Sequence, residues 1–343
     1  MSASNSSSFP MAPPSAGVMT PECINELARG FHASRIILTA YELALFTIIG
    51  DRSMRSSEVA RLIDADERAT DRLMNALTAI GLLEKSNGLF ANTLVAGQCL
   101  VKGQPGYLAG LMHTVNLWDT WSTLTEAVRR GTAAGTPEVN DRGGGWLKAF
   151  IAAMHANAVP RSAEVVALIN LDNVATVLDV GGGSGAYAVA FALAKSGLRA
   201  TVFDLPNVIS LTREYVEREG LSARVSLLAG DYNRDEVGRG YDLVFLSAII
   251  HSNSPQENES LIAKCARALN RGGRLIIQDF IIDEMRTSPP HAAIFALNML
   301  VATRAGDTYT ENEVSGWMRG AGLGEIQSMD TKMGTSLIIG KLD

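Results

Sequence analysis

Cysteine is scarce in this sequence, and the few cysteines are far apart. Cys23, Cys99 and Cys265 are the three in 343 residues. A small secreted domain depends on many paired cysteines, and a zinc site on ligands only a few residues apart. The cysteine usage therefore excludes a disulfide framework and a zinc site, and it is typical of a reducing, cytoplasmic compartment.

An excess of positive charge is also missing. The chain has 30 Lys and Arg residues against 36 Asp and Glu residues, which gives a formal net charge of −6 at pH 7. Proteins that bind nucleic acid or anionic membranes owe much of their affinity to a basic excess. We therefore expect neither nucleic acid nor a membrane surface among the partners.

Long apolar runs are lacking as well. The most apolar early stretch, residues 36–49, is interrupted by Glu42, and it is shorter than the roughly 20 residues that a membrane-spanning helix needs. Residues 1–18 are rich in Ser and Pro and have neither the basic start nor the apolar core of a signal peptide. We predict a disordered tail over 1–18 and no transmembrane helix.

Residues 19–110 are predicted to form a mainly α-helical domain. The stretch RIILTAYELALFTII, residues 35–49, is apolar on nearly all sides, which indicates a buried helix, packed either within the domain or against a second chain. Two shorter helices follow, the second capped by Asp66. Asn87-Gly88 then lies between two short apolar runs, a strong β-hairpin signal. Two short helices followed by a hairpin are typical of a winged helix.

A winged helix raises the possibility of DNA binding, which the charge distribution disfavours. Residues 1–110 carry nine Lys and Arg residues against ten Asp and Glu residues. The candidate recognition helix, which begins Asp66-Glu67-Arg68, is balanced in charge, whereas a helix that faces phosphates should be basic. A packing and dimerisation role is the favoured interpretation.

Residues 111–172 are predicted to be linking helices that line a substrate site. Trp118 and Trp121 stand at helical spacing, and the favoured interpretation is a helix that covers the core; the alternative is that whichever of them points inward lines the site. A loop over residues 131–145 follows by composition. A helix over residues 146–169 is then predicted to break near Pro160.

A glycine-rich turn marks the start of the C-terminal part. In VLDVGGGSGAYAVAFA, residues 177–192, a short apolar strand is followed by Gly181, Gly183 and Gly185 and then by a helix. Such glycines let the backbone approach a ligand, and the helix N-terminus offers unpaired N–H groups. Because Ala186 takes the position of the last glycine in the dinucleotide pattern, which that pattern permits, the glycines alone do not decide between nucleotides.

Polar residues follow each of the next predicted strands. Asp204 ends the second strand, where a carboxylate can accept both ribose hydroxyls. Asp231 and Tyr232 follow the third, where they can meet an adenine amino group and ring. The fourth and fifth strands end in Ser247, His251 and Asp279. Strands that alternate with helices predict a parallel sheet with its ligand at the carboxyl ends.

These segments resemble a known family. The strings LDVGGGSG, FDLP, AGDY, FLSAIIH and GGRLIIQDF occur in the order found in S-adenosylmethionine-dependent O-methyltransferases of the plant caffeate and bacterial polyketide-tailoring type. The resemblance covers about residues 20–343. It implies a Rossmann-like class I methyltransferase domain over residues 173–343, an N-terminal mainly α winged-helix dimerisation domain and a homodimer.

The same resemblance implies roles for the cofactor residues. Gly181, Gly183 and Gly185 would approach the amino-acid part of S-adenosylmethionine. Asp204 would hold the ribose, and Asp231 with Tyr232 the adenine. Ser247 occupies the position of a further cofactor contact at which the family often has lysine, so this residue departs from the pattern.

His251 is the predicted catalytic base. A phenolic acceptor, with a pKa near 10, is mostly protonated at neutral pH, so a base within hydrogen-bond reach assists its methylation. The resemblance places the family's catalytic histidine at His251, and Asp279 on the next strand could fix its tautomer. Two departures stand out. Ser252-Asn253 replace the family's Asp-Trp, and Thr308, beside Asp307, occupies the slot of a second acidic partner.

The acceptor pocket carries fewer signals. Met154 matches a pocket methionine of the family, and His291, Asn298 and Met299 are candidates to line the pocket. No carboxylate cluster follows the fourth and fifth strands, and the implied family needs no metal, so we expect none. The predicted reaction is methylation of a hydroxyl on a small, aromatic secondary metabolite.

Other functions remain open at this stage. The acceptor atom could be carbon or nitrogen, and relatives on this scaffold include decarboxylases and hydroxylases. A winged-helix regulator, a non-catalytic cofactor-binding subunit and a dehydrogenase are further alternatives. Balanced charge at Asp66–Arg72 weighs against the regulator, and the presence of His251 with Asp279 against the non-catalytic subunit.

Overall fold

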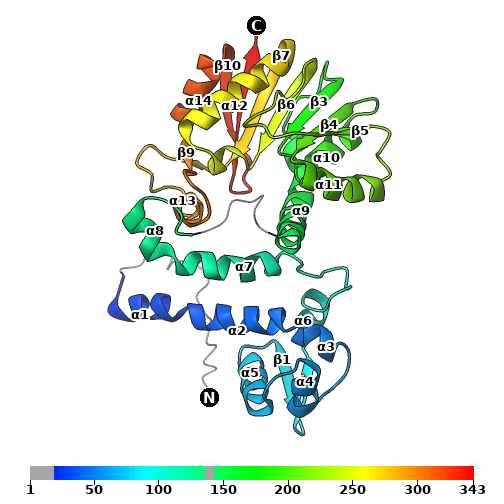
Figure 1. The fold of residues 1–343 in the computed structure, drawn as a ribbon, viewed down its shortest axis with the longest axis vertical. Helices are drawn as coiled ribbons and strands as arrows, with labels where there is room; N and C mark the ends of the chain where they lie inside the picture. The colour runs from blue at the N-terminus through cyan, green and yellow to red at the C-terminus, as the bar shows by residue number, and fades with distance from the viewer. Residues whose placement is uncertain (1–18, 136–142) are drawn as a thin grey trace, which may run out of the picture. The chain divides into compact units, whose positions relative to one another are not determined.

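The computed structural model describes residues 19–135 and 143–343, so the predicted tail and part of the predicted loop, residues 136–142, lie outside the described residues. The chain forms two compact units, residues 1–108 and 109–343 (Figure 1). Among the described residues, no helix combines the length and the apolar character needed to cross a bilayer.

The N-terminal unit is a set of short helices with one hairpin. Its elements are α1 Pro21–Arg29, α2 Phe31–Glu42, α3 Leu45–Ile49, α4 Ser56–Leu62, α5 Glu67–Ala79, β1 Leu83–Ser86, β2 Leu89–Asn92 and α6 Leu94–Cys99. Asp66 caps α5 by accepting from the Ala69 N–H at 2.8 Å. Asn87 and Gly88 both have positive φ, as the two-residue turn between β1 and β2 requires. The predicted order of two short helices and a hairpin is confirmed.

The prediction of one continuous helix over residues 35–49 was wrong. The helix α2 ends at Glu42, and α3 begins at Leu45 after Ala44, which is left-handed with φ of 53°. A left-handed residue cannot continue a right-handed helix. The apolar stretch therefore bends, and its two pieces bury Leu38, Leu45 and Phe46 separately.

Three helices open the second unit: α7 Leu111–Ser122, α8 Leu124–Arg130 and α9 Gly144–Ala167. The predicted break near Pro160 does not occur, because α9 continues through that proline. Pro160 and Ala156, whose carbonyl loses its partner, are both exposed. Water can satisfy that carbonyl, so the helix tolerates the proline on this side.

A mixed sheet forms the centre of the second unit. Within the described residues its strand order is β10-β11-β7-β6-β3-β4-β5. The bounds are β3 Thr176–Val180, β4 Arg199–Asp204, β5 Val225–Ala229, β6 Tyr241–Ser247, β7 Leu269–Asp279, β10 Leu323–Asp330 and β11 Ser336–Leu342. The prediction of a parallel sheet holds for β3 to β7, whereas β11 pairs antiparallel with β7 and with β10. A short turn joins β10 to β11, and only antiparallel neighbours can be joined that way.

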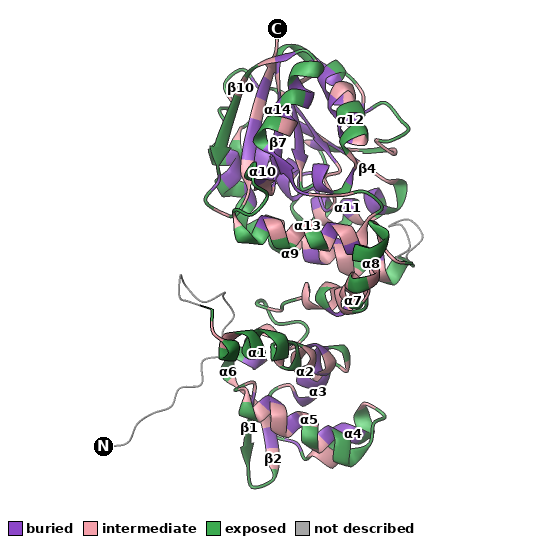
Figure 2. Ribbon diagram, turned by 90° about the vertical axis from the view of Figure 1, so that its left-hand side faces the viewer, coloured by how far each residue is buried: buried purple, intermediate pink, exposed green. Residues whose placement is uncertain are grey.

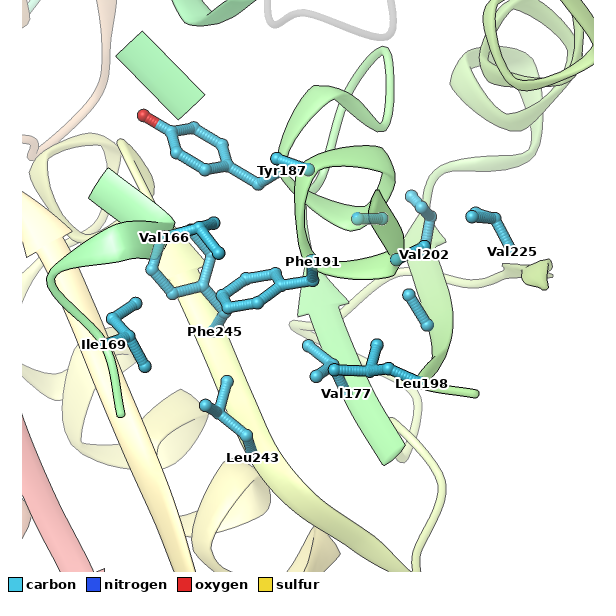
Figure 3. Close-up of a cluster of buried hydrophobic side chains, with 14 of the residues drawn as sticks. Val166, Ile169, Val177, Tyr187, Phe191, Leu198, Val202, Val225, Leu243 and Phe245 are labelled. Carbon is cyan, nitrogen blue, oxygen red and sulfur yellow. The ribbon is translucent and has the colours of Figure 1, made fainter. Parts of the chain in front are cut away.

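Helices cover both faces of this sheet. The helices α9, α10 Ala186–Ala194 and α11 Pro206–Arg218 pack on one face, and α12 Pro255–Ala268 and α14 Glu311–Gly320 pack on the other. Successive residues of one strand, such as Leu243 and Val244, enter opposite cores because side chains alternate across a strand. Figure 3 shows the first core, where the rings of Phe191 and Phe245 meet edge to face at 5.3 Å. Figure 2 shows the resulting buried strands beneath helices with exposed outer sides.

The remaining elements lie beyond the carboxyl ends of β6 and β7. They are the single-turn 3-10 helix η2 Ile250–Ser252, the short paired strands β8 Ile281–Ile282 and β9 Tyr309–Thr310, and the helix α13 Pro290–Ala302. Parallel strands gather their carboxyl ends on one edge, which is where an open α/β sheet binds its ligand. The described fold therefore directs attention to this edge.

Candidate active site

The glycine turn after β3 has the geometry of a close ligand approach. Gly181 has φ of +68°, and a Cβ built on it would lie 2.3 Å from Ile249 Cδ1. Gly183 has φ of +56°, but a Cβ there would meet only Ile151 Cδ1, at 3.9 Å. Glycine at the first position is thus favoured by its positive φ, and a Cβ there would force the Ile249 side chain to shift. Glycine at the second leaves open space beside the backbone.

Asp204 holds this turn from the end of β4. Its carboxylate accepts from the Gly183 N–H at 2.8 Å and from the Leu205 N–H at 2.7 Å. The Thr212 hydroxyl on α11 donates to the Gly183 carbonyl at 2.6 Å, so both polar groups of Gly183 have partners. Burial raises the pKa of Asp204 to about 6. The carboxylate has further lone pairs for donors on a ligand.

A second carboxylate, Asp179, lies beneath the turn and was missed at the sequence level. A Cβ on Gly182 would lie 2.6 Å from its Oδ2 atom. Asp179 is 1% exposed, and burial raises its pKa to about 7. Its Oδ2 accepts from the Ala188 N–H at 3.3 Å, while Oδ1 has no hydrogen-bond partner among the described residues. The detectable signal was an acidic residue inside an apolar strand, since such residues are rarely buried without a reason.

Asp231 and Tyr232 follow β5 as predicted, but the local structure already engages Asp231. Its carboxylate accepts from the Asn233 N–H at 2.9 Å and lies 3.6 Å from Arg234 Nε. The Tyr232 ring lies 4.0 Å from the Cβ position of Gly181, so the structure brings these two residues together. Burial raises the pKa of Tyr232 to about 12, and its hydroxyl donates to Asn253 Oδ1 at 3.2 Å.

Ser247, at the end of β6, makes its side-chain hydrogen bond within the sheet. Its hydroxyl donates to Gln278 Oε1 at 3.0 Å, and Gln278 Nε2 donates to Thr335 Oγ1 at 3.1 Å. The side chain thus joins β6 to β7 and to the turn before β11. The family's lysine would place a charge here, whereas this chain places a neutral, bonded hydroxyl.

His251 and Asp279 form the closest pair of functional side chains at this edge. The Nδ1 atom of His251 lies 2.7 Å from Asp279 Oδ1, and the His251 N–H donates to Asp279 Oδ2 at 3.4 Å. Asp279 is 1% exposed and also accepts from the Phe280 N–H at 2.8 Å. A carboxylate that accepts from Nδ1–H leaves the Nε2 lone pair of the imidazole free to take a proton.

Aromatic rings surround the His251 imidazole. Phe295 on α13 meets it edge to face at 4.8 Å between ring centroids. Phe280 lies 4.3 Å from Phe295 and 6.2 Å from His251, also measured between centroids. Both phenylalanines were missed: Phe280 directly follows β7, and Phe295 lies on α13, which is apolar on nearly all sides, so its sequence does not indicate which side faces the base. They give the base an apolar, aromatic surrounding.

The predicted acceptor residues are dispersed around this cluster. Asn298 Oδ1 accepts from Trp121 Nε1 at 2.9 Å, which joins α13 to α7. The exposed His291 lies 2.8 Å from the Gly334 carbonyl through Nε2, and its ring centroid is 6.0 Å from that of Phe280. Met299 is buried, and Met154 on α9 is half-buried. The orientation of the Asn298 amide is therefore the best defined of the four.

Thr308, in the slot of the family's second acid, contributes no charge. Its hydroxyl is buried and has no hydrogen-bond partner within the described ranges. The neighbouring Asp307 donates its N–H to the His251 carbonyl at 3.0 Å, while its carboxylate lies 3.4 Å from Arg286 Nη1. Asp307 thus contacts the His251 main chain through its N–H, while its carboxylate pairs with Arg286 and not with the His251 ring. Over residues 19–135 and 143–343, no group of three or more His, Cys, Asp and Glu side chains is arranged to hold a metal ion.

A Rossmann-like sheet with a glycine turn and a His–Asp pair at its carboxyl edge is compatible with a class I methyltransferase, and similarity to known proteins identifies the family. Residues 121–324 match the O-methyltransferase domain, and residues 25–102 match the O-methyltransferase dimerisation domain. The chain belongs to this O-methyltransferase family, and its cofactor is S-adenosylmethionine (SAM).

Relatives with named activities support this assignment. The 3-hydroxy-5-methyl-1-naphthoate 3-O-methyltransferase of Streptomyces sahachiroi is 32% identical over 317 residues, which cover 90% of this chain and 91% of that protein. The tetracenomycin polyketide synthesis 8-O-methyl transferase TcmO of Streptomyces glaucescens is 28% identical over 336 residues, or 96% and 98% of the two chains. The structure of PigF with SAH has a TM-score of 0.86 at 25% identity and covers 94% of this chain and 100% of that one.

Proposed function

We propose that the protein methylates a hydroxyl group of a small aromatic secondary metabolite, with His251 as the general base. The observation that carries this proposal is the 2.7 Å contact between His251 Nδ1 and Asp279 Oδ1 at the carboxyl edge of the sheet. Naphthoate and tetracenomycin appear in the names of the relatives, and they support an aromatic acceptor.

The residues around the glycine turn fit SAM. Bound SAM supplies a methyl group on a positively charged sulfur. The sulfur is a good leaving group because it becomes a neutral thioether when a nucleophile attacks the methyl carbon in line. Gly183 leaves open space at the backbone, and Asp204 keeps lone pairs for the two ribose hydroxyls. The Asp179 Oδ1 atom beneath the turn has no hydrogen-bond partner among the described residues, so it can accept from a donor on the amino-acid part. Gly181, Gly185, Asp231, Tyr232 and Ser247 complete the proposed cofactor set.

Asp279 prepares His251 for its role. Its carboxylate accepts a hydrogen bond from the Nδ1–H group and so fixes the tautomer of the ring. The same carboxylate stabilises the imidazolium that forms when Nε2 takes the proton of the acceptor. Such a base typically contributes about 10²–10⁴-fold to the rate. The buried pair also keeps the imidazole from rotating, so Nε2 keeps one direction relative to the sheet.

The surroundings of the base favour a planar, uncharged acceptor. Phe280 and Phe295 offer ring faces and edges beside the imidazole, and aromatic pairs gain about 0.5–1.5 kcal/mol beyond area burial. Trp121 donates to Asn298 Oδ1, so the Asn298 amide N–H groups are directed away from that contact and can donate to an acceptor oxygen. Met154, His291 and Met299 are proposed to complete the pocket.

The N-terminal unit is proposed to form a homodimer. Ile24, Leu27 and Phe31 on α1 and α2 are each more than half exposed, and this stretch lies within or beside the matched dimerisation domain. Burying such apolar side chains against a second chain would be favourable. The helices α4 and α5 with the β1–β2 hairpin are proposed to be a winged helix that serves packing. The three free cysteines support the proposal of a cytoplasmic, reducing setting.

The test is His251→Ala, assayed with methyl-labelled SAM against a panel of naphthols and hydroxylated polyketide aromatics. Turnover should fall at least about 10²-fold, while the SAM dissociation constant stays the same, because the base acts only on the acceptor proton. Added imidazole provides the control, since a small base that enters the vacated site should restore part of the rate. Wild-type turnover in His251→Ala would exclude His251 as the base.

A further inference from the structure

The turn that carries His251 departs from the family at the two residues that follow. Ser252 and Asn253 replace the family's Asp-Trp, so something else must hold the turn. The structure shows two buried amides at this place. Asn253 is 4% exposed and Asn258, in the first turns of α12, is 0% exposed. Buried amides require hydrogen-bond partners, and their partners indicate what they hold.

One end of this amide pair holds the main chain beside the base. Asn258 Nδ2 donates to the carbonyl of Ile250 at 2.9 Å, and Asn258 Oδ1 accepts from Asn253 Nδ2 at 3.1 Å. Ile250 is the residue directly before His251. The peptide group between Ile250 and His251 is therefore fixed by a side chain from α12.

The other end of the pair reaches the cofactor side. Asn253 Oδ1 accepts from the Tyr232 hydroxyl at 3.2 Å, and Tyr232 lies beside Gly181. The Asn253 carbonyl accepts from the Tyr309 hydroxyl at 2.5 Å. A continuous chain of side-chain hydrogen bonds thus runs from Tyr232 through Asn253 and Asn258 to the Ile250 carbonyl.

Four polar groups at and beside the base are held from three separate segments of the chain. Asn258 on α12 binds the Ile250 carbonyl, and the Asp307 N–H binds the His251 carbonyl at 3.0 Å. Asp279 on β7 binds both the N–H and the ring of His251. Gly306 closes over the same carbonyl, because a Cβ on it would lie 2.3 Å from His251 O. Removal of one support would let the turn shift while the other two remain.

We propose that Asn253 and Asn258 are positioning residues that fix the His251 turn. Through their hydrogen bonds they also couple the position of this turn to Tyr232, which is part of the proposed cofactor site. This inference rests on the proposed role of His251 as base. A reacting group misplaced by about 1 Å can cost on the order of 10²-fold in rate. In this chain the amide pair therefore holds the turn at the place where the sequence departs from the family pattern.

The test compares three variants with the wild-type enzyme at saturating SAM and acceptor. Asn258→Ala should lower kcat by about 10- to 100-fold with the KM for SAM unchanged, because only the base is displaced. Tyr232→Phe removes just the hydroxyl at the far end and should lower kcat by about fivefold, the equivalent of one ordinary hydrogen bond. The double variant should show the kcat of Asn258→Ala alone, since residues in one network are not additive.

Cys265→Ala is the matched control for loss of packing. Cys265 is fully buried on the same helix, α12, where it belongs to the hydrophobic core, and it makes none of the hydrogen bonds described above for the His251 turn. It should lower the melting temperature and leave kcat intact. An equal fall of kcat in Cys265→Ala would show that general loosening of α12, and not positioning, explains the result.

The remaining outcomes separate this inference from the proposed function. If His251→Ala abolishes turnover and Asn258→Ala keeps the wild-type kcat, the positioning role alone is wrong. If His251→Ala keeps turnover, the base and its positioning are both overturned. Should Asn258→Ala fail to fold, Tyr232→Phe decides, because this conservative variant with an unchanged kcat would contradict the coupling.

Discussion

Two aspartates, Asp204 and Asp279, each lie at the carboxyl end of a strand of the same sheet, but they bind different kinds of group. Asp204, after β4, accepts from two main-chain N–H groups and holds the glycine turn. Asp279, at the end of β7, accepts from a histidine ring contributed by the residues after β6. We call the first region the cofactor half, which follows β3, β4 and β5, and the second the base half, which follows β6 and β7. In the cofactor half a carboxylate binds the main-chain N–H groups of a glycine turn, whereas in the base half the central contact joins two side chains.

The difference explains what each half can do. Main-chain donors and positive-φ glycines provide a fixed surface that suits a constant cofactor. Side chains from η2, β7, α12 and α13 meet in the base half, so its shape can change by substitution while the fold persists. A family that uses one methyl donor and many acceptors needs this division.

The largest effect on kcat is expected from a substitution of Asp279 in the base half. Asp279→Asn should lower kcat by about 10²–10⁴-fold, because an amide that donates to Nδ1 would leave the proton on Nε2, where it blocks base catalysis. The SAM dissociation constant, measured by calorimetric titration, should stay unchanged. A variant that binds SAM weakly instead would mean that Asp279 belongs to the cofactor half.

A matched pair of glycine variants tests the cofactor half. Gly181→Ala and Gly183→Ala both place a side chain at positive φ, a strain of roughly 1–3 kcal/mol. Gly181→Ala should lose more stability in thermal unfolding, because its Cβ meets Ile249. Gly183→Ala should raise the SAM dissociation constant by about tenfold, equivalent to 1.4 kcal/mol, because its Cβ occupies the open space beside the turn. Unchanged SAM affinity in Gly183→Ala would show that the cofactor does not approach this residue.

The smallest expected effect is a pH dependence of SAM binding. The pKa of Asp204 is raised to about 6 in the folded protein, so its carboxylate takes up a proton as pH falls from 7 to 5. Ribose hydroxyls donate to the charged form, so SAM affinity should weaken below about pH 6.

The same group has the opposite effect on the stability of the cofactor-free fold. Because its pKa is higher in the folded than in the unfolded state, protonation of Asp204 should stabilise that fold as pH falls from 7 towards 4. Asp179, with a pKa near 7, titrates over the same range. The difference between the wild-type enzyme and Asp204→Asn, measured by calorimetry from pH 7 to pH 5, isolates the contribution of Asp204. Identical pH curves for the two proteins would contradict its role.

The sequence was most informative where local chemistry dictates the backbone. The glycine turn, the Asn87-Gly88 hairpin and the strand-ending position of Asp204 follow from φ preferences and from the order of elements. The His251–Asp279 contact followed from two strands predicted to be neighbours, and the structure has them as β6 and β7. The turn and the hairpin depend on residues close in the chain, and the His251–Asp279 contact depends on the pairing of two successive parallel strands.

Features that depend on side-chain burial and helix packing were missed or wrong. Asn253 and Asn258 are only five residues apart, but their contact depends on the burial of both side chains, and Phe295 faces the base only because of how α13 packs. The bend at Ala44 and the straight passage of α9 through Pro160 are likewise decided by packing and exposure. The antiparallel edge had a detectable signal, the short connection between β10 and β11, which permits no parallel crossover.

The most direct test of this division is to measure SAM affinity and methyl-transfer rate side by side in Asp204→Ala and His251→Ala. Asp204→Ala should weaken SAM binding by roughly 1–3 kcal/mol, the cost of leaving polar groups unpaired, and should recover most of its turnover at saturating SAM. His251→Ala should bind SAM normally and turn over at least about 10²-fold more slowly. If either variant changes both quantities to the same degree, the two halves do not act separately and the account is contradicted.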